Sequence, residues 1–423
     1  MAGISIKNGR ILTSKGFVEG TLLIEDGIIT SIGEKEAAEH VIDAKGNIVM
    51  PGLINAHTHL GMTLFRGYAD DLPLKEWLTE YIWPIEAKLT EDDVYAGTLL
   101  GCLEMIKSGT TAFADMYIRM NGTAKAVEKS GLRGVLSYGM IELGDEEKGE
   151  KELKIGREFV KKWNGTSNGR ITAMYGPHAP NTCSSEFLMC VREYADEDKV
   201  GIHIHVSETK AEVEQIKAQC SMSSVKLLDS LNFLGPDVLA AHCIWLSPED
   251  IQILKKNDVK IAHNPTSNMK LASGIAPVPE LLEAGITVGL GTDGCASNNT
   301  LDMFYEMKMA ALLHKVHKLD PTAIPAQKAL EMATVDGARS AGLDTGVIAE
   351  GKKADIIIVD MNKPHLTPRH DLISHMVYCA KGSDVSTTIV DGKILMEDYQ
   401  VKIFDEAEVI ARAEKRAKDL MGR

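Results

Sequence analysis

The chain carries the segment Pro51-Gly52-Leu53-Ile54-Asn55-Ala56-His57-Thr58-His59 directly after the apolar residues 48–50. Apolar character continues through Leu53 and Ile54, which is typical of a buried strand. Side chains alternate in direction along a strand, so His57 and His59 point to the same face at its end. Two imidazoles at this spacing form half of a metal site. An isolated His-x-His is more often a pair of locally hydrogen-bonded residues, so this interpretation requires further ligands elsewhere in the chain.

Apolar runs that are typical of strands alternate with stretches of helical period through the middle of the chain. Eight such runs are present, at residues 48–59, 110–117, 134–140, 171–178, 200–206, 238–245, 260–264 and 287–293. Helical stretches separate them, for example at residues 91–107, 186–194, 224–231 and 279–283. This alternation predicts an α/β fold with a parallel sheet, and eight units over roughly 300 residues predict a (β/α)8 TIM barrel. A doubly wound open sheet is the alternative, which is disfavoured because no Gly-x-Gly-x-x-Gly follows the first strand.

Both ends of the chain are rich in short strands and turn signals. Asn8-Gly9, Asp26-Gly27 and Asp391-Gly392 each separate apolar alternations, a pattern that predicts three hairpins. Because chain ends often lie close in space, we expect residues 1–50 and 348–399 to form one small β-sandwich. The metal-dependent barrel would then span residues 51–347, and residues 400–423 would contain an exposed helix at 406–420.

The composition is ordinary for a globular protein, with 44% hydrophobic and 25% charged residues among 423. A net charge of −14 argues against nucleic acid or an anionic membrane as the main partner. The amino terminus lacks the pattern of a signal peptide, and no apolar run approaches the ~20 residues that span a bilayer. The seven cysteines form no Cys-x-x-Cys pair, which predicts reduced thiols and a cytoplasmic location.

Histidine or aspartate stands at the C-terminal end of six of the eight runs, although the chain has only 13 histidines. In a (β/α)8 barrel these ends converge on the face that carries the active site. His57, His59, one histidine of the fifth run (His203 or His205) and Asp293 would supply three nitrogens and one oxygen. This set suits one divalent metal per subunit, zinc first and ferrous iron second, with room for a water. The fourth run contains no lysine that could bridge two ions, which favours a single metal.

Several longer motifs occur in a fixed order along the chain. They are residues 51–59, 73–78 (Pro-Leu-Lys-Glu-Trp-Leu), 83–86 (Trp-Pro-Ile-Glu), 176–178 (Gly-Pro-His), 205–208 (His-Val-Ser-Glu), 263–270 (His-Asn-Pro-Thr-Ser-Asn-Met-Lys) and 289–294 (Gly-Leu-Gly-Thr-Asp-Gly). Through these motifs the whole chain resembles the amidohydrolase superfamily. Within it, the chain is most similar to the deaminases of S-adenosylhomocysteine, 5'-methylthioadenosine and 5'-deoxyadenosine. Each motif alone is unspecific, whereas their joint occurrence in this order is highly specific.

The resemblance implies a metal-ligand set and selects among the histidines of the fifth run. The implied ligands are His57, His59, His205 and Asp293. His203 is then expected on the same face of its strand, one step deeper than His205.

The resemblance also implies roles for further residues. Glu208 would shuttle protons, and His242 would lie beside the metal-bound water. Glu86 would bind the ribose hydroxyls, and His178 would contact the substrate. Taken alone, Glu86 would pass for a surface residue of a helix and Glu208 for a carboxylate that favours a helix start. His178 and His242 would pass for buried structural histidines.

The implied reaction is hydrolytic deamination of 5'-modified adenosines, and of adenosine itself, to the inosine analogues and ammonia. Metal-activated hydroxide would attack carbon 6 of the purine, with Asp293 accepting a proton from the water. Glu208 would donate protons to nitrogen 1 and to the leaving amine, while His242 would stabilise the tetrahedral intermediate. The implied partners are therefore a small nucleoside substrate, contacted also by Glu208 and Asp293, and further copies of the chain in a dimer or tetramer.

The segment 141–156 contains no arginine, although arginines of relatives at this place can meet the carboxylate of S-adenosylhomocysteine. Its lysines, or Arg157 just beyond it, leave that contact open. The sequence therefore favours substrates without an anionic tail. The alternatives are the same metal machinery acting on guanine, a pterin or a triazine, and, in a different class, a non-catalytic barrel used for binding. Glu86 distinguishes the first alternative from a nucleoside deaminase, because guanine, a pterin or a triazine has no ribose for Glu86 to bind. The presence of Glu208 and the metal ligands disfavours the second alternative.

Overall fold

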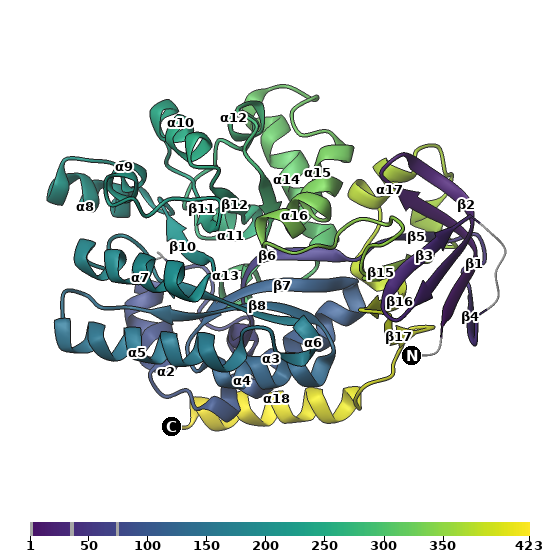
Figure 1. Ribbon diagram of the computed structural model, residues 1–423, viewed down its shortest axis with the longest axis horizontal. Helices are drawn as coiled ribbons and strands as arrows, with labels where there is room; N and C mark the ends of the chain where they lie inside the picture. Colours follow the sequence, from purple (N-terminus) through teal and green to yellow (C-terminus); the bar gives the residue numbers. More distant parts are fainter. Residues whose placement is uncertain (1–2, 34–37, 73–75) are drawn as a thin grey trace.

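The computed structural model describes residues 3–33, 38–72 and 76–423, which form a barrel and a separate sheet (Figure 1). The Pro73-Leu74-Lys75 part of the second motif and the first two residues of the chain lie outside the described residues. The barrel strands follow one another in sequence order, and all pair in parallel. They are β6 (Leu53–His59), β7 (Thr110–Tyr117), β8 (Arg133–Met140), β9 (Ile171–Pro177), β10 (Ile202–Val206), β11 (Val238–His242), β12 (Lys260–His263), β13 (Val288–Leu290) and β14 (Asp293–Gly294). Because β14 pairs with β6, the sheet closes, and the predicted TIM barrel is confirmed.

Two of the expected strands are divided at glycines. The first run splits into β5 (Ile48–Pro51), which joins the other sheet, and β6 of the barrel. A Cβ at Gly52 would lie 2.1 Å from Thr111, so the chain can cross from one sheet to the other only with glycine here. The eighth run splits into β13 and β14 around Gly291, where a Cβ would lie 2.8 Å from the His57 backbone nitrogen. This close approach sets the end of the eighth strand against the His57 segment.

Helices cover the outside of the barrel (Figure 1). They include α3 (Glu91–Ser108), α4 (Met120–Ser130), α5 (Glu146–Trp163), α7 (Ser185–Asp198), α8 (Lys210–Cys220), α9 (Ser224–Ser230), α10 (Pro248–Lys256), α12 (Val278–Glu283), α14 (Met303–Lys318), α15 (Ala326–Met332) and α16 (Val335–Ser340). The four helices expected within the barrel are therefore present as α3, α7, α9 and α12. Local signals fix their ends, as in α3, which starts with a capping box between Thr90 and Asp93 and stops at the left-handed Gly109.

The two chain ends meet in one nine-stranded sheet. Its other strands are β1 (Ile4–Thr13), β2 (Gly16–Glu25), β3 (Ile28–Ile32), β4 (His40–Asp43), β15 (Ile356–Val359), β16 (Val385–Val390), β17 (Lys393–Glu397) and β18 (Gln400–Val401). Antiparallel pairing of β5 with β15 joins the amino-terminal and carboxy-terminal parts. An apolar core that includes Ile6, Ile24 and Ile356 is shared by both parts. The expected sandwich is thus a single sheet built from both ends of the chain.

Two of the three predicted hairpins are confirmed, and one is wrong. Asp26-Gly27 connects β2 to β3, and Asp391-Gly392 connects β16 to β17. Asn8-Gly9 instead lies inside the continuous strand β1, where the pairing with β2 shifts register between Ile6 and Gly9. A Cβ at Gly9 would lie 2.6 Å from Val49 of β5. The Asn-Gly pair therefore marks the bulge at which the parallel neighbour of β1 changes from β4 to β5.

The carboxy-terminal helix α18 (Glu406–Met421) is present but is not exposed on all sides. It packs along α3, with Val409, Ala413 and Leu420 buried (Figure 1). Lys107 and Glu406 form an ion pair of 2.9 Å across this contact. Every helix within residues 3–33, 38–72 and 76–423 is too short or too polar to span a bilayer.

Candidate active site

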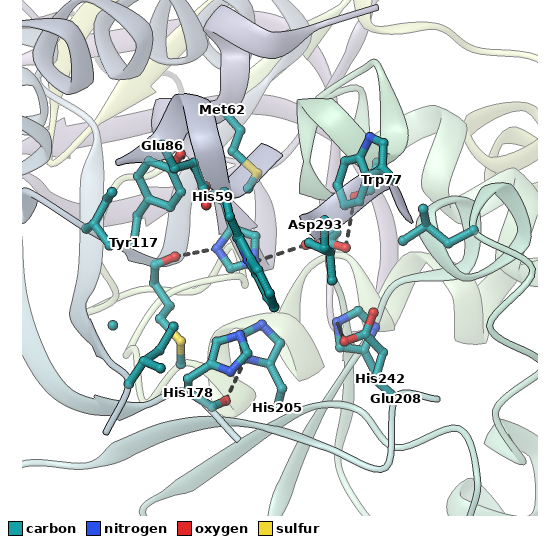
Figure 2. A pocket seen from close by; sticks show the side chains of 18 residues that line it. His59, Met62, Trp77, Glu86, Tyr117, His178, His205, Glu208, His242 and Asp293 are labelled. Carbon is teal, nitrogen blue, oxygen red and sulfur yellow. Dashed lines mark hydrogen bonds and ion pairs between the residues drawn. The ribbon is translucent and has the colours of Figure 1, made fainter. Parts of the chain in front are cut away.

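A cavity opens at the C-terminal ends of the barrel strands and collects the candidate residues (Figure 2). It is lined by seven of the eight residues singled out from the sequence: His59, Glu86, His178, His205, Glu208, His242 and Asp293. The eighth, His57, is fully buried directly beneath the cavity, beside His59 and Asp293. Residues that are up to 236 positions apart in the chain are therefore brought together because parallel strands end at one face of the barrel.

The side chains proposed as metal ligands fall, together with His242, into two overlapping groups that could each hold an ion: His57, His59 and His205, and His57, Asp293 and His242. Nε2 of His57 and Nε2 of His59 lie 3.5 and 3.1 Å from Oδ1 of Asp293. Ligand atoms of His57, His59 and His205 all lie within 4.8 Å of one another. His57 Nε2 is buried and has no hydrogen-bond partner among the described residues. Because an unpaired buried nitrogen is costly, this atom and the acceptor-rich cluster around it fit a bound cation.

Hydrogen bonds to the other ring nitrogen orient each of the three histidines. Nδ1 of His205 donates to the carbonyl oxygen of His178 at 2.8 Å, and Nδ1 of His59 donates to the carbonyl oxygen of Met116. Nδ1 of His57 lies 2.8 Å from Nε2 of His203, which is one step deeper on β10 than His205. Since each Nδ1 is engaged in this way, each Nε2 faces the common point, as metal-binding imidazoles require.

Asp293 is held as an oriented carboxylate. Its Oδ2 accepts hydrogen bonds from the hydroxyls of Ser267 at 2.6 Å and Ser297 at 3.0 Å, and its Oδ1 accepts from the backbone N–H of Gly294 at 2.8 Å. Burial acts to raise the pKa of Asp293, but the His57 and His59 imidazoles beside its carboxylate outweigh it and hold this pKa well below its usual value. The side chain is therefore ionised and rigid, which suits a metal ligand.

The backbone at three strand ends adopts the left-handed region. Ser207, His242 and Asp293 have φ values of 52°, 70° and 61°. Non-glycine residues in this region carry strain of order 1–3 kcal/mol each, and such residues cluster at functional sites. Of the three, His242 and Asp293 line the cavity, and Ser207 directly precedes Glu208, which also lines it.

The motif at residues 263–270 forms hydrogen bonds with two residues of the site, His242 and Asp293. It continues from β12 into α11 (Pro265–Lys270). Asn268 Oδ1 lies 2.9 Å from His242 Nδ1, while Ser267 bonds to Asp293. His242 therefore presents Nε2 to the cavity, where it lies 3.9 Å from Oε2 of Glu208.

Glu208 and Glu212 are neighbouring carboxylates whose side chains point to different places. Glu212 accepts the backbone N–H groups of Ser207 and Glu208 at 3.0 and 2.9 Å, and Thr209 caps α8. The helix-start role therefore belongs to Glu212 and Thr209, and the Glu208 side chain faces the cavity (Figure 2). Burial raises the pKa of Glu208, and burial together with the nearby Glu208 raises the pKa of Glu212 to about 7.

Glu86 lies on the wall of the cavity beside Tyr117 and His59 (Figure 2). It ends α2 (Trp83–Glu86), which follows the π-helical turn η2 (Trp77–Ile82). Tyr117 Oη donates to Glu86 Oε1 at 2.7 Å, and burial raises the pKa of Glu86. Glu86 is thus a cavity residue and not a solvent-exposed helix residue. His178 also faces the cavity, with its Nδ1 lying 2.9 Å from Thr182 Oγ1.

The remaining wall of the cavity is apolar. Its side chains include Met62, Trp77, Leu78, Met116, Ile118, Ile141 and Leu271. No lysine or arginine lines the cavity among the residues that the structure describes. Arg157 instead pairs with Glu197 and Asp198 and stacks over Tyr194, away from the site.

Several residues around the site were not singled out from the sequence. Tyr117 ends the second apolar run, so extending the strand-end rule to tyrosine would have identified it. Ser267 and Asn268 lie within a motif that was noted but not assigned. Glu212 carried no signal, because a glutamate in the first turn of a helix is common.

Comparisons with known proteins find a family that matches most of the chain and relatives that match it over nearly its full length. Residues 48–395 match the amidohydrolase family. A 5'-deoxyadenosine deaminase of Methanosarcina mazei is 61% identical, over 100% of this chain and 99% of that protein. A 5-methylthioadenosine/S-adenosylhomocysteine deaminase of Syntrophomonas wolfei is 52% identical, over 97% of this chain and 96% of that protein.

A solved structure resembles the fold throughout. It is a crystal structure of an adenosine deaminase from Xanthomonas campestris with bound zinc, at a TM-score of 0.94 and 31% identity. The match covers 99% of both chains.

Proposed function

Because the chain belongs to the amidohydrolase family, we propose that it is a metal-dependent deaminase of 5'-modified adenosines. Its products would be the corresponding inosine analogues and ammonia. The observation that carries this proposal is the composition of a single cavity. The cavity is bordered by a three-histidine and aspartate donor set, by Glu208 and His242, and by the carboxylate of Glu86. The named activities of the relatives from Methanosarcina mazei and Syntrophomonas wolfei support the same reaction.

We propose zinc as the metal, held by His57, His59, His205 and Asp293. Three imidazole nitrogens and one carboxylate oxygen suit this ion, and the similar adenosine deaminase structure carries bound zinc. When bound at such a site, zinc lowers the pKa of a water molecule to about 7 and so makes a nucleophile available at neutral pH.

The residues around that nucleophile supply the proton transfers. Asp293 would accept one proton from the attacking water, and Glu208 would donate its proton to nitrogen 1 of the purine. Glu208 would then take up the proton of the hydroxyl added at carbon 6 and pass it to the leaving amine, and the proton held by Asp293 would return to Glu208. A raised pKa suits Glu208 for donation at neutral pH. His242 would donate from Nε2 to the oxygen that adds to carbon 6, in the tautomer whose Nδ1 accepts from Nδ2 of Asn264 at 3.3 Å.

The far end of the cavity fits the ribose and a small uncharged 5' group. Glu86 can accept hydrogen bonds from the ribose hydroxyls while Tyr117 holds one of its oxygens. Met116, Ile118 and Ile141 also line the cavity, and among the described residues no lysine or arginine lines it to meet an anionic tail. We therefore favour 5'-deoxyadenosine and 5'-methylthioadenosine over S-adenosylhomocysteine.

The direct test is a comparison of five substrates with the zinc-loaded protein. 5'-Deoxyadenosine, 5'-methylthioadenosine, S-adenosylhomocysteine, adenosine and adenine are offered separately, and ammonia release is measured. We expect turnover of the nucleosides, weaker turnover of S-adenosylhomocysteine and none of adenine. If none of the five released ammonia and guanine, a pterin or a triazine was turned over, this proposal would be replaced by its closest alternative. A protein that binds no metal and turns over no substrate would instead be a binding module.

Substituting Glu86 by alanine tests the ribose contact. Because a hydrogen bond to a charged group contributes about 1.5–3 kcal/mol, we expect kcat/KM on 5'-deoxyadenosine to fall roughly 10- to 100-fold. Glu80→Ala is the matched control, since Glu80 is an exposed glutamate of the adjacent turn η2. An unchanged kcat/KM in Glu86→Ala would remove Glu86 from the substrate site.

We further propose that the protein works as a homo-oligomer in the cytoplasm. All seven cysteines are free thiols, which is typical of a reducing compartment. Light scattering on the purified protein measures the oligomeric state, and a monomer at working concentration would contradict the first part.

A further inference from the structure

His203 stands directly behind a metal-binding histidine and has no role in the reaction described above. It is fully buried, and its Nε2 lies 2.8 Å from Nδ1 of His57. The two rings meet edge to face, with centroids 4.9 Å apart and an interplanar angle of 81°. His59 and His205 use backbone carbonyls at the corresponding position. His57 is therefore the one ligand imidazole of the three that is oriented by a side chain.

The direction of this hydrogen bond depends on what His57 Nε2 does. A neutral imidazole carries one N–H and one acceptor nitrogen. If His57 Nε2 is to bind a metal, its lone pair must be free, so the proton stays on Nδ1 and is donated to His203 Nε2. If the proton instead moves to His57 Nε2, it faces Asp293 Oδ1 at 3.5 Å, and His203 becomes the donor. The pair thus has two arrangements, and only the first one binds a metal.

We propose that His203 is a positioning residue for the metal, which acts by accepting the hydrogen bond from His57 Nδ1. This inference rests on the metal site of the proposed function. Acceptance at His203 Nε2 fixes the tautomer and the ring plane of His57, so that Nε2 faces His59 and Asp293. This arrangement is unfavourable at the other ring nitrogen, because the buried Nδ1 of His203 has no hydrogen-bond partner among the described residues.

Three substitutions separate this role from simple packing. His203→Gln places an amide oxygen near the position of Nε2 and keeps an acceptor. His203→Asn has the same chemistry but is one bond shorter, and His203→Phe keeps the ring shape without an acceptor. Each protein is stripped with a chelator, and the Kd for Zn²⁺ is measured by competition with a chromophoric chelator. We expect His203→Asn and His203→Phe to raise the Kd for Zn²⁺ about 10- to 100-fold, and the Kd of His203→Gln to stay near the wild-type value.

His314→Phe is the matched control, because it removes another buried imidazole that is bonded to a histidine. His314 Nε2 lies 3.1 Å from His263 Nε2, and neither residue belongs to the proposed ligand set. This variant is expected to lose thermal stability but to bind zinc like the wild type. The visible spectrum of the Co²⁺-loaded protein gives a second readout, since it should change in His203→Asn and not in His314→Phe.

The outcomes distinguish this inference from the function on which it rests. Equal zinc affinity of the wild type, His203→Asn and His203→Gln would overturn the positioning role, even if His203→Phe failed to fold. Wild-type protein that binds no zinc would overturn the proposed metal as well. Weaker binding in Asn with near-normal binding in Gln would support the inference whatever substrate the enzyme prefers.

Discussion

Replacing Glu208 by glutamine is expected to lower kcat on 5'-deoxyadenosine by about 10²- to 10⁴-fold, the range that general acid–base catalysis contributes. Glutamine keeps the shape and one oxygen of the side chain but cannot give up a proton to the purine ring. The steady-state rate of ammonia release with saturating substrate measures the effect. KM is expected to change far less, because Glu86 and the apolar wall still hold the nucleoside.

The surroundings of Glu208 make this substitution informative. Its backbone is fixed by Glu212, and its carboxylate approaches His242 at 3.9 Å without belonging to the proposed ligand set. Zinc affinity is therefore expected to stay at the wild-type value. Glu214→Gln is the control, since Glu214 is an exposed glutamate of the same helix α8. A Glu208→Gln protein with normal zinc content and near-normal kcat would show that another group carries the proton.

Replacing Arg133 by methionine is expected to destabilise the fold by about 3–5 kcal/mol, the range for breaking a buried ion pair by removing one partner. Arg133 begins β8, at the end of the barrel opposite the active site. Its guanidinium contacts Asp355, which directly precedes β15, at 2.9 Å and Asp391, in the turn between β16 and β17, at 3.3 Å. The side chains of Arg133 and Asp355 are only 6% and 1% exposed, so the aspartate would be left buried without its partner.

Thermal and urea unfolding of the metal-free protein measure this effect. Lys151→Met is the matched control, because the Lys151–Glu147 pair is largely exposed and contributes about 0–1 kcal/mol. A second substitution, Asp355→Leu in the Arg133→Met background, should recover part of the loss by removing the unpaired charge. Equal stability of Arg133→Met and Lys151→Met would mean that the buried Arg133–Asp355 pair contributes no more to stability than an exposed pair does.

The strand-end pattern was sufficient to predict the barrel and most of the site. The alternation of strand and helix repeats eight times, and in a closed parallel barrel every strand end must reach the same face. His57, His59, His205, His242 and Asp293 therefore had to lie near one another once the eight runs were assigned. The roles of Glu86 and Glu208 came from the resemblance, because a single glutamate near a helix has no distinguishing pattern.

Local turn signals were less reliable where strands from elsewhere in the chain pair with the segment that carries the signal. Asp26-Gly27 and Asp391-Gly392 form the expected turns, since the strands on either side of each turn pair antiparallel with one another. Asn8-Gly9 has the same local preference, but β2, β4 and β5 pair along both sides of β1 and hold it straight. Pairing along ten residues outweighs the turn preference of two.

The sequence by itself determined the order of strands and helices, the class of metal ligands and the family. These properties depend on residue type and spacing, which are local. Only the tertiary structure decided which atoms meet: Tyr117 with Glu86, Ser267 with Asp293, Asn268 with His242 and His203 with His57. Such contacts join strands and loops far apart in the chain, so their distances and directions depend on how the whole barrel closes. Spacing along the sequence predicts that the barrel closes, but it does not give these distances and directions.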